Sequence, residues 1–312
     1  MITIRKLTRI IFYLSCLLFV ISCKKDKPDE NNTTIIPSGG PYLIFKFRFD
    51  STQARLNNLG QSAVLPAGHS AQHPLMNKMS AHYIELSPSM TTPVGAGRVL
   101  YHAPETTLGG STAILHSQSV MKADGEEFFR FPIDSIPAGT YNYLRISVAY
   151  QNYDIKYKYV FNGTPLYLNG TIASFVGYNT YVNTYTIKTQ TVSPSATQGG
   201  TGNHLQGYWG FETTVAGVTS VSDGQSPPGA TTVVNPLWSS SPIPPGSCLV
   251  TGQFANGLTI NGNETIDKTI VVSFSTNRSF EWKDFNADGW FEPQGGDTVV
   301  DMGLRGMIPL VQ

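Results

Sequence analysis

The sequence is poor in charged residues and lacks the common catalytic motifs. Asp, Glu, Lys and Arg make up 13% of the 312 residues, and 21 acidic and 21 basic residues give a formal net charge of zero. Without a basic excess, the chain is not expected to bind nucleic acid. The motifs G-x-S-x-G and H-E-x-x-H, the P-loop and the dinucleotide fingerprint are missing. We therefore expect a binding protein rather than an enzyme, with a glycosidase that uses two facing carboxylates as the remaining catalytic alternative.

Aromatic and turn-forming residues, by contrast, are abundant. The sequence has 15 Tyr, 16 Phe, 30 Gly and 20 Pro. Aromatic and β-branched side chains suit half-buried pleated surfaces, and short strands separated by Gly, Pro and Asn turns are typical of sandwiches and barrels. The composition therefore predicts an all-β fold, either one large β-sandwich or two smaller ones with long loops.

Period-two alternation predicts the individual strands. In 42–50, three Phe residues alternate with Lys46 and Arg48, which is the pattern of a strand with one buried face. Comparable patterns predict strands at 126–133, 141–153, 155–161, 180–192, 208–218, 248–254, 257–260, 268–276, 279–282, 298–303 and 306–311.

The segment 74–86 is the one plausible helix. Leu75, Met79, Tyr83 and Leu86 fall on one stripe at helical spacing. The segment ends in "HYIEL", which also suits a strand, so the sequence leaves both alternatives open.

A Ser-, Gly- and Thr-rich segment at 193–203 is the candidate boundary inside the chain. It separates an N-terminal β region, 42–192, from a C-terminal β region, 202–312. The two regions are expected to be either two sandwiches or the two halves of one.

The first residues have the features of an export signal. Three basic residues precede an apolar run at 10–21 that is too short to span a bilayer, so 1–22 is expected to be a signal peptide. Its end, "FVISC", resembles the lipobox of bacterial lipoproteins. The resemblance implies lipidation of Cys23, an outer-membrane anchor on the periplasmic or the cell-surface side, and a flexible tether over 23–41. An ordinary signal peptide or a short membrane anchor is the alternative.

The body of the chain then keeps one thiol. Cys16 would leave with the signal peptide and Cys23 would carry lipid, so Cys248 has no partner for an intrachain disulfide. The fold must therefore depend on its core, and Cys248 is expected to be a buried strand residue rather than a nucleophile.

The stretch "DFNADGW" resembles the start of an EF-hand-type calcium loop. Asp284, Asn286 and Asp288 match positions one, three and five of that loop, and Gly289 matches position six. The resemblance implies a backbone carbonyl ligand from Trp290 at position seven.

The rest of the loop departs from this motif. Position twelve is Gly295 instead of the bidentate Glu, and Pro293 argues against an exiting helix. Glu292 or Asp297 could supply the missing carboxylate, which would make this a structural calcium site between strands. The alternative is an Asx-rich turn without an ion.

Histidine and methionine cluster in one other stretch. His69, His73, Met76, Met79 and His82 offer imidazole and thioether ligands, which suit copper. A proline after His73 prevents one helix from presenting all three histidines, and the alternative places Met79 and His82 at the edge of a core.

Several aromatic residues suggest a ligand surface. Tyr178, Tyr181 and Tyr185 alternate with Asn residues, and His204 precedes Trp209. Aromatic rings stack on sugars and Asn side chains bond hydroxyl groups, although strands with solvated or core faces explain the same patterns.

Together these features predict an exported, lipid-anchored binding protein with a structural calcium ion, whose ligand is a glycan or another extracellular polymer. The alternatives are a copper-binding periplasmic lipoprotein, for which copper would be the cofactor, and a structural adhesin subunit that binds an envelope protein.

Overall fold

The structure, a computed structural model, describes residues 39–226, 241–244 and 246–312. All of these residues belong to one compact unit. The expected signal peptide, Cys23 and residues 23–38 of the expected tether lie outside the described residues. No helix in the described part of the chain is both long and apolar enough to cross a membrane.

The predicted all-β class is confirmed, because the described elements are β-strands and three short 3-10 helices. The largest sheet has the order β15 (Val218–Gln225), β14 (Tyr208–Val215), β9 (Thr164–Phe175), β8 (Gly139–Phe161), β3 (Leu75–Ser87) and β4 (Arg98–His102), with β16 (Cys248–Ile260) also paired to β8. A second sheet has the order β20 (Met307–Val311), β17 (Lys268–Ser275), β1 (Tyr42–Asp50) and β7 (Glu127–Pro132).

Three smaller sheets and the 3-10 helices complete the described part. The small sheets are β13 (Gly202–Leu205), β10 (Asn179–Val182), β6 (Ala113–Leu115) and β5 (Glu105–Thr106); β19 (Thr298–Met302), β18 (Phe280–Lys283) and β2 (His69–Gln72); and β11 (Tyr185–Thr186) with β12 (Thr191–Val192). The 3-10 helices are η1 (His116–Gln118), η2 (Ile133–Ser135) and η3 (Ala196–Gln198).

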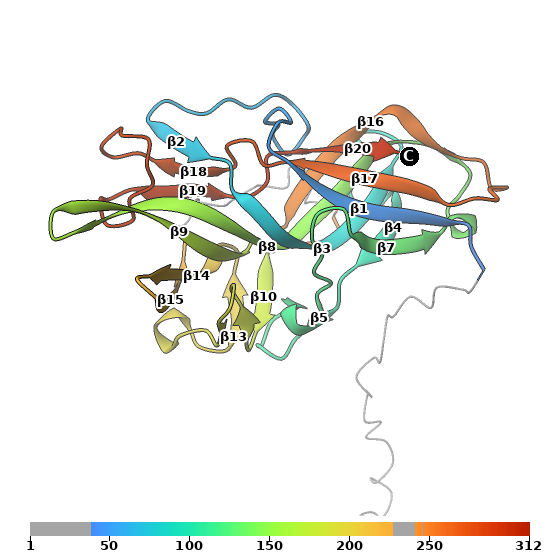
Figure 1. The fold of residues 1–312 in the computed structure, drawn as a ribbon. Helices are drawn as coiled ribbons and strands as arrows, with labels where there is room; N and C mark the ends of the chain where they lie inside the picture. The colour runs from blue at the N-terminus through green and yellow to red at the C-terminus, as the bar shows by residue number, and fades with distance from the viewer. Residues whose placement is uncertain (1–38, 227–240, 245) are drawn as a thin grey trace, which may run out of the picture. The chain divides into compact units, whose positions relative to one another are not determined.

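Strand β1 illustrates how the alternating pattern makes the core. Leu43, Phe45 and Phe47 are fully buried, while β1 lies between β7 and β17 in the sheet (Figure 1). The parallel pairing of β1 with β17 places Phe47 beside Val272. These side chains join residues of β3, β8 and β16 in one buried cluster, so the main core lies between the two large sheets.

The two regions expected at 42–192 and 202–312 share these sheets. Strand β1 of the first pairs with β17 of the second, and β8 of the first pairs with β16 of the second. The segment 193–203 contains η3 and the start of β13. The hydrophobic face of each region is therefore covered by strands of the other, as in the expectation of two halves of one sandwich.

The helix considered for 74–86 is wrong, because this segment is β3. It pairs with β8 from Leu75 to Ser87, with three register irregularities. Met79 and Leu86 are fully buried, whereas Leu75 is 68% exposed, so the helical stripe does not share one environment. Backbone pairing to a long neighbouring strand outweighs the local helical spacing.

Candidate metal centre

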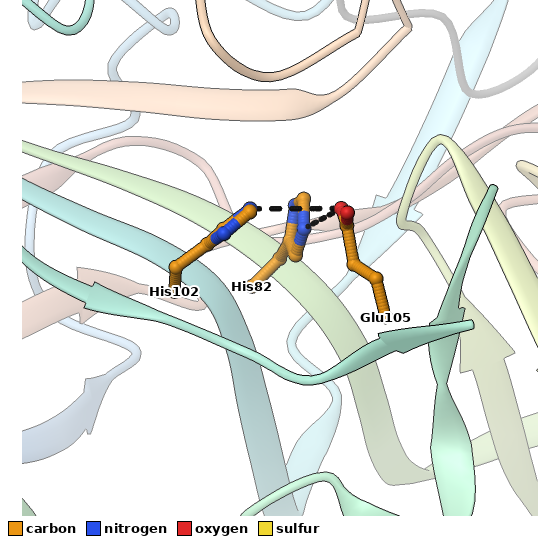
Figure 2. Close-up of side chains that lie close together, drawn as sticks. All are labelled: His82, His102 and Glu105. Carbon is orange, nitrogen blue, oxygen red and sulfur yellow. Dashed lines mark hydrogen bonds and ion pairs between the residues drawn. The ribbon is translucent and has the colours of Figure 1, made fainter. Parts of the chain in front are cut away.

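Three consecutive strands bring two histidines and a glutamate together. His82 lies in β3, His102 ends β4 and Glu105 starts β5. Strands β3 and β4 run antiparallel, with His102 opposite Tyr83, and the amide of Ala103 donates to the carbonyl of His82. This pairing fixes the two histidines on adjacent strands, and the short connection from His102 returns Glu105 to them (Figure 2).

The ligand atoms of the three side chains converge on one point. His82 Nε2 lies 2.9 Å and His102 Nε2 lies 3.5 Å from Glu105 Oε1, and both rings are directed at this carboxylate in Figure 2. Ligand atoms held about 2.0–2.1 Å from a tetrahedral zinc ion are about 3.3–3.4 Å apart. Only small side-chain movements would therefore turn this cluster into a coordination shell.

No other such cluster occurs in the described residues. Among their His, Cys, Asp and Glu side chains, this is the one group of three whose ligand atoms all lie within 4.8 Å of one another. The His82 side chain is fully buried, and those of His102 and Glu105 are 42% and 26% exposed. The site is thus closed on the His82 side and open to solvent on the other.

Tyr178, just before β10, completes the cluster. Its hydroxyl donates to Glu105 Oε1 over 2.9 Å, and its ring lies 5.3 Å from that of His82. Partners of this kind orient ligating carboxylates in metal sites. His82 Nδ1 is buried and has no hydrogen-bond partner among the described residues, so its second ring nitrogen lacks the usual outer partner.

The electrostatics suit a cation. Burial lowers the pKa of His102, the nearby His82 lowers it further, and this keeps the ring nitrogen free of a proton at neutral pH. Burial raises the pKa of Glu105, but hydrogen bonds from His82 and Tyr178 outweigh it, so this pKa is lowered overall. Burial and the bond to Glu105 raise the pKa of Tyr178, which stays a protonated donor.

The five residues expected to bind copper are not brought together. Only His82 belongs to the cluster. Met79 packs in the main core, and Met76 packs against a second core, the buried cluster that contains Phe280 and Trp282. His73 Nδ1 accepts the amide of Arg278, and His69 binds Glu281. The reason is that His69, His73 and His82 are spread along β2, the short connection after it and β3, where the extended chain keeps them apart.

His69 takes part in a separate charged network. Glu281, whose side chain is 3% exposed, lies 2.6 Å from His69 Nδ1, 2.7 Å from Arg55 and 2.5 Å from Arg305. Arg305 also pairs with Asp301. Burial raises the pKa of Glu281, but the bonds from His69 and Arg55 and the charge of Arg305 lower it overall. These contacts fasten strand β2 and two connecting segments to β18.

The predicted calcium loop is held by hydrogen bonds within the protein. Asp284 Oδ2 accepts the amide of Gly289, Asn286 Oδ1 that of Asp288, and Asp288 Oδ1 that of Trp290. These hydrogen bonds are the ones expected of an Asx-rich turn without an ion, which is the alternative to a calcium site. Asp284 Oδ1 is buried and lacks a hydrogen-bond partner among the described residues.

An ammonium group lies among the carboxylates of this loop. Lys158 Nζ lies 2.5 Å from Asp288 Oδ2 and 2.5 Å from Glu292 Oε1. Asp297 accepts the amides of Phe285 and Glu292, and burial, with nearby negative charges, raises its pKa. A calcium ion would have to compete with Lys158 for two of its expected ligands, so this loop is a weaker candidate for a metal than the His82 cluster.

The aromatic residues expected to form one ligand surface lie at separate places. Tyr178 contacts Glu105, and Tyr181 faces Asn203 in the β10–β13 pair. The other three lie at two further places. Tyr185 bonds Tyr208, and His204 stacks on the same Tyr208 with ring centroids 4.0 Å apart. Trp209 packs against residues of the second core.

Glu212 and Cys248 are side chains of types that can act in catalysis, but their surroundings do not favour it. The Glu212 carboxylate accepts the backbone amides of residues 188–190, which leaves little capacity for acid–base work. Cys248 starts β16, as expected, but the residue is half-buried instead of buried. Desolvation of its thiol raises the pKa to about 12, so the thiol stays protonated.

Sequence reasoning missed His102 and Glu105. They are three residues apart in "HAPE", a spacing too common to indicate a metal site. Their partner, His82, is twenty positions away from His102 and meets it through strand pairing alone. Comparisons with protein-family models, curated proteins and solved structures found no match.

Proposed function

We propose that this protein binds a divalent transition metal ion through His82, His102 and Glu105. The observation that carries the proposal is the convergence of two Nε2 atoms and one carboxylate oxygen within 4.8 Å. Tyr178 orients Glu105, and the open side next to His102 leaves positions for water or another ligand.

The donor set selects the class of metal. Two imidazoles and a carboxylate suit Zn²⁺, Fe²⁺ and Cu²⁺, and divalent metals follow an affinity order in which Cu²⁺ is highest. Soft Cu⁺ prefers thioether and thiolate ligands, and Met76 and Met79 pack elsewhere. We therefore propose Cu²⁺ or Zn²⁺ as the bound ion.

The proposed setting is the cell envelope. The lipobox-like end of 1–22 and the charged residues after Cys23 support export and lipid anchoring. Glycan binding is less well supported, because Tyr178, Tyr181 and Tyr185 contribute to separate contacts instead of one surface.

A competition titration tests the proposed site. The mature chain is titrated with Zn²⁺, Cu²⁺ and Ca²⁺ against a coloured chelator, and with Cu⁺ under reducing conditions. The proposal expects one Zn²⁺ or Cu²⁺ per chain. The variants His102→Ala and Glu105→Gln should each weaken binding by more than the roughly 10–100-fold typical of outer-shell changes.

His73→Ala is the matched control, because His73 is an exposed histidine outside the cluster. It should bind metal as the wild type does. Wild-type protein that binds neither ion above background, or variants of the cluster that bind unchanged, would contradict the proposed function and leave the three side chains as a hydrogen-bonded network.

A further inference from the structure

An apolar cavity lies far along the largest sheet from β4, the strand that supplies His102. It has a volume of ≈ 1040 Å³ and is lined by strands β8, β9, β14 and β15 and by the segment 291–302. Alternate residues of β8 and β14 face it, including Tyr157 and Tyr159 of β8 and Trp209 and Phe211 of β14. This volume matches the upper range of pockets that hold small molecules.

Two glycines let the large rings form the cavity wall. A Cβ atom at Gly170 would lie 2.1 Å from the ring of Phe211, and one at Gly224 would lie 2.4 Å from the ring of Trp209. The ring of Phe211 therefore lies over Gly170 of β9, and the ring of Trp209 lies over Gly224 of β15. Trp209 and Phe211 remain half-buried, and Phe161 at the outer end of β8 is 58% exposed. The protein thus presents a continuous aromatic surface to the cavity.

Several polar groups of the cavity are already paired within the protein. The Tyr157 hydroxyl donates to Thr213, whose own hydroxyl donates to the Asn169 carbonyl. Gln225 donates to a backbone carbonyl, and both carboxylate oxygens of Asp297 accept backbone amides. None of the lining side chains in the described part of the chain has a buried polar atom without a partner. A hydrocarbon placed here would therefore leave no buried polar atom without a partner.

The segment 284–297 brings negative charge to one side of the cavity. Asp297 is the one charged residue among the described residues that line the cavity. The segment as a whole carries four carboxylates and no Lys or Arg, and among the described residues Lys158 is the cation that pairs with it, so three formal negative charges remain in the segment. This charge repels an anionic head group and is complementary to a cationic one.

From the apolar walls and this charge, we propose that the cavity binds a small amphiphile with a hydrocarbon chain or ring and a neutral or positively charged head. The hydrocarbon part stacks on Tyr159, Trp209 and Phe211, and the head lies toward the segment 284–297. The site is independent of the metal cluster, because they share no residue.

Three probes with the same chain test the proposal: 1-octanol, octyltrimethylammonium and octanoate, each below its micelle concentration. Calorimetric titration of the full mature protein should give saturable binding of the first two with a negative heat-capacity change. Octanoate should bind at least about tenfold more weakly, because like charges face each other.

A pair of variants on β15 locates the site. Ser222 lines the cavity opposite Phe211, whereas Thr219 is exposed on the other face of the strand and does not line it. Ser222→Tyr should weaken binding of octanol by about tenfold, because a ring that displaces two methylene groups of the probe removes their burial. Thr219→Tyr should leave the affinity unchanged, and thermal melting checks that both variants fold.

Three results with these probes and variants would overturn the proposal: an absence of saturable binding for both octanol and octyltrimethylammonium, equal effects of Ser222→Tyr and Thr219→Tyr, and octanoate binding as tightly as the cation. Displacement of bound octanol by a neutral oligosaccharide would also overturn it and would assign the cavity to a glycan.

Discussion

Glu105→Gln provides the sharpest test of the metal site, because it keeps the shape of the side chain and removes its charge. Glu105 accepts bonds from His82 and Tyr178, each 2.9 Å long. Without metal, the loss of these charge-assisted bonds at a partly exposed side chain should lower the free energy of unfolding by about 1–2 kcal/mol.

The response to metal should be larger in the wild type. An ion at one hundred times its dissociation constant stabilises the native state by about 2.7 kcal/mol, which corresponds to a rise in Tm of about 4–5 °C for a chain of this size. Differential scanning calorimetry with Zn²⁺ should show this rise in the wild type and in His73→Ala, and little or none in Glu105→Gln. An equal rise in Glu105→Gln, or its loss in His73→Ala, would refute the assignment.

Three further predictions concern other parts of the chain. Glu281→Gln should destabilise the protein by about 3–5 kcal/mol in guanidinium unfolding, because it removes the carboxylate that pairs with the buried guanidinium group of Arg55. The pKa of Glu281 lies below its ordinary value of 4.5, so the stabilisation that its charge provides is present above pH 4.5 and is lost as the pH falls through the lowered pKa. Between pH 7 and 3 the wild type should therefore lose more stability than Glu281→Gln. Parallel losses in the two proteins would contradict the network. If the loop at 284–297 holds calcium in competition with Lys158, Asp284→Ala with Asp288→Ala should abolish a calcium-dependent rise in Tm, and a wild-type Tm that ignores chelator rejects that site. Cys23→Ser should release the protein from the membrane fraction, whereas persistent anchoring would argue against lipidation there.

Much of the strand pattern followed from local sequence. The alternation in 42–50 predicted β1 with the bounds that the structure has, and 268–276 predicted β17 with Ile270, Val272 and Phe274 on its buried face. The two strands expected at 141–153 and 155–161 are one continuous β8. Asp154 between them is accommodated because its carboxylate binds Thr171 and Lys188 beside the sheet.

What the sequence determined by itself was the fold class, since period-two alternation and turn residues act between neighbours in the chain. It could not determine the conformation of 74–86, where helical and strand spacing compete and pairing with β8 decides. Nor could it reveal the metal cluster, because His82 meets His102 and Glu105 only after β3, β4 and β5 have found their partners. Only the tertiary structure makes that choice, since coordination depends on distances between side chains that the chain order does not contain.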